Sequence, residues 1–189
     1  MTESTDPRPL YSAALTWAHG LMAGAHDLDA PTPCAEFDVR DLLGHLVATV
    51  ERARVIGEGG DPRSVPLVVR GPADPAGACA EATAGALAVW ADDALLDRPL
   101  TVPWGTVPGR SALWGYLNET LVHGWDLAVA TGQDPEADPA LAGAVLAVVP
   151  RFLPEEPRGG PVPFGPVVPS RPDAGPTERL ANWSGRTRP

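Results

Sequence analysis

The stretch from Tyr116 to Ala128, Y-L-N-E-T-L-V-H-G-W-D-L-A, constrains the fold of this chain more than any other. Its apolar residues recur at helical spacing, which predicts a helix packed within a core. Glu119 and His123 stand four residues apart in it and therefore share one helical face. Polar side chains that point into a core need a partner, and a metal ion is one such partner. We therefore expect a helical bundle that closes around this pair.

A second apolar helix is expected from Val39 to about Gly57, with Asp38 as its capping residue. His45 lies one turn into it, and the neighbouring Gly44 leaves room for close approach by another segment. A histidine from this helix can meet the Glu/His pair across the core of a bundle. Two imidazoles and one carboxylate would leave one coordination position open, as in catalytic rather than structural zinc sites.

The acid-x-x-x-His spacing also occurs at Asp41 and His45. With 24 acids and four histidines in 189 residues, chance gives about 0.5 such pairs, so each pair could instead be a hydrogen-bonded core or helix-surface pair. We interpret Asp41 as a helix cap or, less favoured, as an acceptor that orients the His45 ring. Asp126, three residues after His123, is either such an acceptor or an ordinary surface acid.

Pocket residues are harder to single out from the sequence. Trp104 and Trp125 could wall a pocket that binds a cofactor or substrate, although a tryptophan in an apolar helix is more often a core residue. Arg52, like Arg40 and Arg54 of the same predicted helix, could bind an anionic substrate, although arginines on a helix rim are usually solvated. These alternatives stay open at the level of sequence.

Composition excludes several classes of partner. The net charge of −10, from 14 arginines and 24 acids, argues against nucleic acid and anionic membranes. The first ten residues lack the features of a signal peptide, and no apolar run is long enough to span a bilayer. Two cysteines without C-x-x-C spacing suit a reducing compartment, so we expect a soluble, cytoplasmic protein. Cys34 is interpreted as a small buried or loop residue, because the sequence places no histidine beside it.

The remaining elements follow from periodicity and from breaker residues. Further helices are expected over about 10–28, over 76–96, from a cap at Ser111 to Thr131, and over 139–152 after a cap at Asp138. The segment 100–110, with two prolines and two glycines, predicts an extended excursion or a small hairpin. Eight prolines between 154 and 176 exclude a helix there. We therefore divide the chain into a bundle over 1–153 and a proline-rich extension over 154–189 that packs on it.

Three motifs together resemble a known family. They are T-P-C-A-E-F-D-V-R-D-L-L-G-H-L-V from Thr32, W-G-T-V-P-G from Trp104 and L-V-H-G-W-D-L-A-V-A-T-G from Leu121. They resemble the actinobacterial metal-binding proteins related to the N-terminal domain of mycothiol-dependent maleylpyruvate isomerase, in the wider DinB-like superfamily. F-G-P-V-V-P and R-L-A-N-W-S-G-R, near the end of the chain, resemble the C-terminal extension common in that family.

This resemblance implies an all-α, DinB-like four-helix bundle with an extended proline-rich C-terminal tail. It also implies a divalent metal, Zn²⁺ first and Ni²⁺ or Fe²⁺ as alternatives, held by His45, Glu119 and His123. The implied activity is a mycothiol S-transferase or a thiol-assisted isomerase acting on a small electrophile, and the fold is compatible with a homodimer. Two alternatives remain: a thiol-independent metal enzyme acting on a natural-product-type intermediate, and a non-catalytic metal-binding protein.

Overall fold

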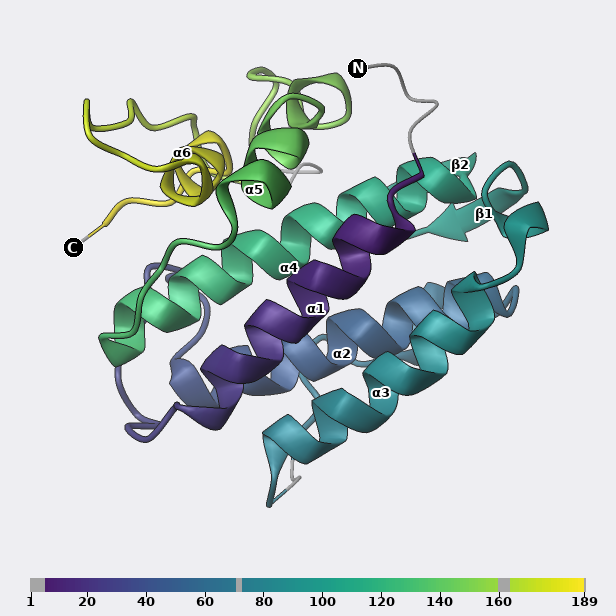
Figure 1. Cartoon of the computed structure of the whole chain (residues 1–189), viewed down its shortest axis with the longest axis horizontal. Helices are drawn as coiled ribbons and strands as arrows, with labels where there is room; N and C mark the ends of the chain where they lie inside the picture. Colours follow the sequence, from purple (N-terminus) through teal and green to yellow (C-terminus); the bar gives the residue numbers. More distant parts are fainter. Residues whose placement is uncertain (1–5, 71–72, 160–163, 189) are drawn as a thin grey trace.

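Four long helices form the body of the molecule in the computed structural model, which describes residues 6–70, 73–159 and 164–188. They are α1 (Arg8–Ala23), α2 (Val39–Gly57), α3 (Pro75–Trp90) and α4 (Gly109–Thr131). Helices α1 and α4 run in one direction, and α2 and α3 run in the opposite direction (Figure 1). The prediction of an all-α four-helix bundle is confirmed.

Helix α1 is shorter than the sequence predicts. It ends at Ala23, before the expected end near Leu28, because Gly24 has low helical propensity and takes the capping position. The helix lies close against α4, since a Cβ atom at Gly124 would overlap the ring of Trp17. This close approach packs α1 against the helix that carries Glu119 and His123.

Helix α2 begins as predicted, with the Asp38 carboxylate accepting a hydrogen bond of 2.8 Å from the backbone N–H of Asp41. After α2 the chain turns back along the helix toward the start of α3 (Figure 1). This return segment, residues 65–70, lies directly against α2, because the Val69 N–H donates to the carbonyl of Gly44 at 3.1 Å. A Cβ atom at position 44 would collide with the carbonyl oxygen of Val69, so the glycine permits the contact.

Helix α3 ends at Trp90 and not near Leu96, because Asp92 caps a short 3₁₀ turn, Asp93–Leu95, by accepting from Ala94. A small antiparallel hairpin follows, made of β1 (Pro99–Val102) and β2 (Gly105–Pro108). Gly105 has a φ of 142°, a conformation that residues with a side chain rarely adopt. The small hairpin, one of the two alternatives predicted for this segment, is thus present.

The start of α4 corrects one prediction, because the helix begins at Gly109 and Ser111 lies inside its first turn. No side-chain cap is needed here. The N–H of Gly109 donates to the carbonyl of Arg98, and the N–H of Arg110 donates to that of Leu96. At the other end, Gly132 adopts the left-handed conformation with φ of 69°, as expected for a helix stop.

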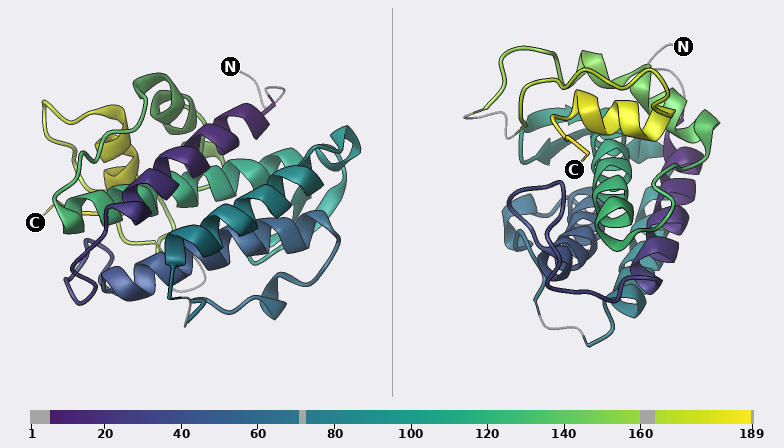
Figure 2. Two further views of the ribbon diagram at one scale, coloured as in Figure 1. Left: turned by 60° about the horizontal axis from the view of Figure 1, so that its bottom comes forward. Right: turned by 90° about the vertical axis from the view of Figure 1, so that its left-hand side faces the viewer.

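The C-terminal third contains two short helices, α5 (Pro139–Leu146) and α6 (Pro176–Trp183), which pack on each other at one side of α4 (Figure 2). Helix α5 stops before Phe152 because Pro150 cannot donate, and a 3₁₀ turn, Val149–Arg151, replaces its last part. None of the described residues in 154–175 is helical, as the prolines predict. Helix α6 was not predicted; it begins with proline at its first position. Within the described residues, no helix is long and apolar enough to cross a membrane.

Candidate metal centre

His45, Glu119 and His123 meet between α2 and α4, and one ligand atom of each lies within 4.8 Å of the others. The Nε2 atom of His123 is 3.4 Å from a carboxylate oxygen of Glu119. The two imidazole rings lie edge to face with centroids 4.6 Å apart. Both histidines are 5% exposed, whereas the side chain of Glu119 is partly exposed, so the cluster is buried on the histidine side. The structure thus brings together the residues that the sequence grouped.

The ring of His45 is held from the side opposite the cluster. Its Nδ1 lies 2.8 Å from the carbonyl oxygen of Leu67, which can only accept, so Nδ1 carries the proton. The Nε2 atom then presents its lone pair to the cluster, and the Thr49 hydroxyl, at 3.5 Å, is a long hydrogen-bond partner for it. Burial, assisted by the charge of His123, lowers the pKa of His45 to about 4. His45 is therefore neutral at pH 7, which is the form that binds metals.

Asp41 neither caps α2 nor orients the His45 ring, which corrects both of its interpretations. Its carboxylate accepts from Arg70 at 3.2 Å, and the capping position belongs to Asp38. The acceptor for the ring is Leu67, which lies 22 residues away on the return segment. A backbone carbonyl carries no sequence signature, so the pattern of side chains could not reveal this contact.

The ring of His123 lies between two carboxylates. Its Nδ1 is 3.1 Å from Asp126, which is completely buried, and its Nε2 faces Glu119. Asp126 is therefore an acceptor for the ring and not a surface acid. Burial opposes a charge on His123, but hydrogen bonds to Asp126 and Glu119 outweigh it and raise the pKa to about 9. Burial likewise opposes ionisation of Glu119, yet the histidine lowers the pKa of that carboxyl.

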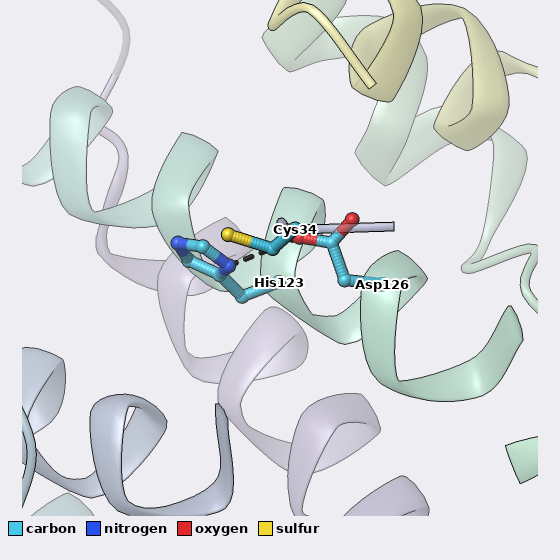
Figure 3. A group of neighbouring side chains, drawn as sticks. All are labelled: Cys34, His123 and Asp126. Carbon is cyan, nitrogen blue, oxygen red and sulfur yellow. Dashed lines mark hydrogen bonds and ion pairs between the residues drawn. The ribbon is translucent and has the colours of Figure 1, made fainter. Parts of the chain in front are cut away.

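A second group of potential ligands shares His123. Cys34, His123 and Asp126 also offer atoms within 4.8 Å of one another, and Figure 3 shows these three side chains. The guanidinium of Arg186 already lies against this group, 3.0 Å from Asp126 and 3.3 Å from the Cys34 sulfur. Burial raises the pKa of the Cys34 thiol, although the charge of Arg186 opposes this. This second group therefore has a cation supplied by the chain itself.

The donor set of the first group fits a divalent metal ion. Two imidazole nitrogens and one carboxylate oxygen are ligands that Zn²⁺ accepts, and imidazole also suits Ni²⁺ and Fe²⁺. Each ring is fixed through its other nitrogen, by Leu67 for His45 and by Asp126 for His123. Such contacts orient the ligating nitrogen and raise its basicity. The side chain of Glu119 is 24% exposed, which marks the side from which a further ligand can approach.

The structure separates the predicted pocket residues. Trp104 is 52% exposed on the hairpin, and its ring lies 5.6 Å from that of Tyr116, one turn before Glu119. Trp125 is fully buried and is a core residue. Arg52 donates to the carbonyls of Pro66 and Val65 and so ties the return segment to α2. Sequence reasoning gave no role to Arg186, whose only signal was its place in the R-L-A-N-W-S-G-R motif.

The fold and the site together define a helical bundle with a candidate His/Glu/His metal centre. Residues 13–128 match the family described as the mycothiol maleylpyruvate isomerase N-terminal domain, and the chain belongs to this family. Two uncharacterized proteins, from two strains of Mycobacterium tuberculosis, are each 33% identical over 166 residues. The match covers 86% of this chain and 87% of each relative. No solved structure matches the chain significantly.

Proposed function

We propose that this protein is a metal-dependent enzyme that joins a low-molecular-weight thiol, mycothiol, through its sulfur to a small electrophile, or that uses the thiol to isomerise such an electrophile. The observation that carries the proposal is the first donor group. His45 presents an unprotonated Nε2 whose only other contact in the described structure is the Thr49 hydroxyl at 3.5 Å, and His123 and Glu119 face it. No arginine of the described chain forms an ion pair with the Glu119 carboxylate. Membership of a family described by a mycothiol-dependent isomerase supports the thiol as co-substrate.

His45, Glu119 and His123 would hold the metal, which we propose to be Zn²⁺, with Ni²⁺ or Fe²⁺ as alternatives. A divalent ion supplies the positive charge that lowers the pKa of a thiol and keeps it as the nucleophilic thiolate. The chain keeps the two rings in position through Leu67 and Asp126. Phe37, stacked on His45 with ring centroids 4.8 Å apart, covers that ring on one face. This apolar cover limits access of water to the reacting groups.

Cobalt-substituted protein tests the proposal directly. Addition of mycothiol should produce a thiolate-to-metal charge-transfer band, because the thiolate would occupy the open position. His45→Ala should lose both the cobalt and the band, whereas Arg40→Gln, on the outer face of the same helix and paired with Asp29, should retain both. An absence of any spectral change with mycothiol and with simpler thiols would contradict the thiol chemistry. Turnover of an electrophile without thiol would favour a thiol-independent metal enzyme.

A further inference from the structure

The carbonyl that holds the His45 ring belongs to a residue that its own packing does not fix. Leu67 lies in the return segment, where the chain forms neither helix nor strand, and the residue is 59% exposed. A hollow of about 370 Å³, lined by Leu67 and Phe37 among others, lies beside it. The direction of the Leu67 carbonyl therefore depends on what holds the chain before and after this residue.

Arg52 holds the chain directly before Leu67. Its Nη2 atom donates to the carbonyl of Pro66 at 2.9 Å and to that of Val65 at 3.4 Å. The peptide plane that contains the Pro66 carbonyl ends at the Cα atom of Leu67, so fixing this plane restricts the carbonyl that follows. Arg52 can reach the same segment as His45 because it lies seven residues, or about two helical turns, further along α2.

Gly44 holds the chain after Leu67. The N–H of Val69 donates to the Gly44 carbonyl at 3.1 Å, and a Cβ atom at position 44 would overlap the carbonyl oxygen of Val69. Gly44 directly precedes His45, so this contact is made at the turn of α2 that carries the proposed ligand. The Leu67 carbonyl is therefore held between two contacts to α2, one from Arg52 and one from Gly44.

We propose that Arg52 is a positioning residue of the metal centre, acting on His45 through the return segment and the Leu67 carbonyl. The inference rests on the metal centre of the proposed function and not on its thiol chemistry. A neutral imidazole that donates from Nδ1 keeps on Nε2 the lone pair that a metal requires. If the carbonyl moves away, the ring can rotate and can carry its proton on Nε2 instead. Loss of a contact that orients a ligand in this way typically costs about 10–100-fold in metal affinity.

Zinc affinity, measured by competition with a chromophoric chelator, is the first test. Arg52→Met keeps the apolar stem and removes the donors, so the affinity should fall about tenfold. Arg52→Lys should recover most of this loss, because a single nitrogen reaches both carbonyls and an ammonium group has three donors on one nitrogen. Arg54→Met is the matched control. The Arg54 guanidinium pairs with Glu51 and Glu58, each at 2.6 Å, so this variant should bind zinc as the parent does.

The tautomer of His45 is a readout that a merely structural role of Arg52 would not change. It is measured from the ring ¹⁵N shifts of labelled, chelator-treated protein at pH 7, with the resonances assigned by their loss in His45→Gln. The parent should carry the proton on Nδ1, whereas Arg52→Met should show a mixture with the Nε2 form. Gly44→Ala should show the same mixture, because it displaces the return segment at its other contact while alanine favours the helix.

Unchanged zinc affinity in Arg52→Met, or an equal loss in Arg54→Met, would overturn the proposal. The same His45 tautomer in the parent and in Arg52→Met would also overturn it. A parent protein that binds zinc no more tightly than His45→Ala would refute the metal centre and this proposal together. A missing thiolate band with mycothiol would refute only the thiol chemistry, because neither the zinc competition nor the tautomer measurement involves a thiol.

Discussion

The two nitrogens of His123 face two different environments. On the Nδ1 side, Asp126 and Cys34 surround a position where Arg186 already supplies a positive charge. On the Nε2 side, Glu119 and His45 surround a position to which no arginine of the described chain donates. Both groups contain three ligand-type residues at similar spacing. The difference teaches that donor atoms alone do not define a metal site, because a buried anion can equally be neutralised by a cationic side chain.

The largest expected effect comes from removing a ligand on the Nε2 side. His45→Ala should reduce bound metal in dialysed protein to less than about a tenth of an equivalent, because two donors cannot hold the ion against the buffer. Cys34→Ser, the matched change on the Nδ1 side, should retain the metal content of the parent. Elemental analysis of both proteins measures this. Loss of metal in Cys34→Ser with retention in His45→Ala would reverse the assignment of the two groups.

Removal of the cation on the Nδ1 side is expected to destabilise the fold. Arg186→Met removes the guanidinium and leaves the buried carboxylate of Asp126 with the His123 ring as its remaining partner, which should lower the free energy of unfolding by about 3 kcal/mol in urea titrations. Arg186→Met combined with Asp126→Asn should recover most of this loss, since the buried carboxylate that the guanidinium neutralised is then absent as well. Equal free energies of unfolding of the single and double variants would show that the Arg186–Asp126 ion pair does not stabilise the fold.

The same Arg186→Met variant should make the Nδ1 side of His123 resemble the Nε2 side, to which no arginine of the described chain donates. Without Arg186, the Cys34, His123 and Asp126 group has no cation from the chain and can accept a second metal ion. Cobalt-loaded Arg186→Met should then show a thiolate band without added mycothiol, and further replacement of Cys34 by serine should remove it. A band already present in the parent protein would contradict the comparison.

A smaller effect is expected from the acceptor that orients His123. Asp126→Asn keeps the size of the side chain but removes its charge, so metal affinity should fall about tenfold. Competition with a chromophoric chelator measures the change. Asp41→Asn, on an acid that does not contact the His45 ring, should leave the affinity unchanged.

The smallest effect concerns how the segment that carries Arg186 is anchored. Glu178 on α6 accepts from Arg171 at 2.8 Å, and this hydrogen bond lowers the pKa of the carboxyl. Its contribution is present above the unfolded-state pKa and is lost as the pH falls through the lower folded-state pKa. Because Arg171 is half exposed, we expect a loss of less than about 1 kcal/mol on acidification. Glu178→Gln should flatten this part of the stability profile; an unchanged profile would exclude the pair as an anchor.

Local sequence determined the helices and the face on which each ligand stands. Periodicity located α2 and α4, Asp38 marked the start of one, and Gly132 marked the end of the other. These signals act within one or two turns of chain, which is why they can be read without a fold. The same local rule paired Glu119 with His123, because residues four apart share a helical face. Reliance on such local signals also explains the wrong prediction of a cap at Ser111. The first N–H groups of α4 donate to backbone carbonyls of the preceding segment, so no capping side chain is needed.

Only the tertiary structure decided which of these residues have partners and which do not. The acceptor of the His45 ring comes from 22 residues away, and the arginine against Asp126 comes from 60 residues away. Such contacts depend on where the return segment and the C-terminal segment pack. The spacing of apolar residues within one helix does not predict how distant segments pack. Cys34 likewise gained its neighbours His123 and Asp126 through folding alone. The sequence thus supplied the donors of the centre, while packing decided that one side of His123 is neutralised by Arg186 and the other is not.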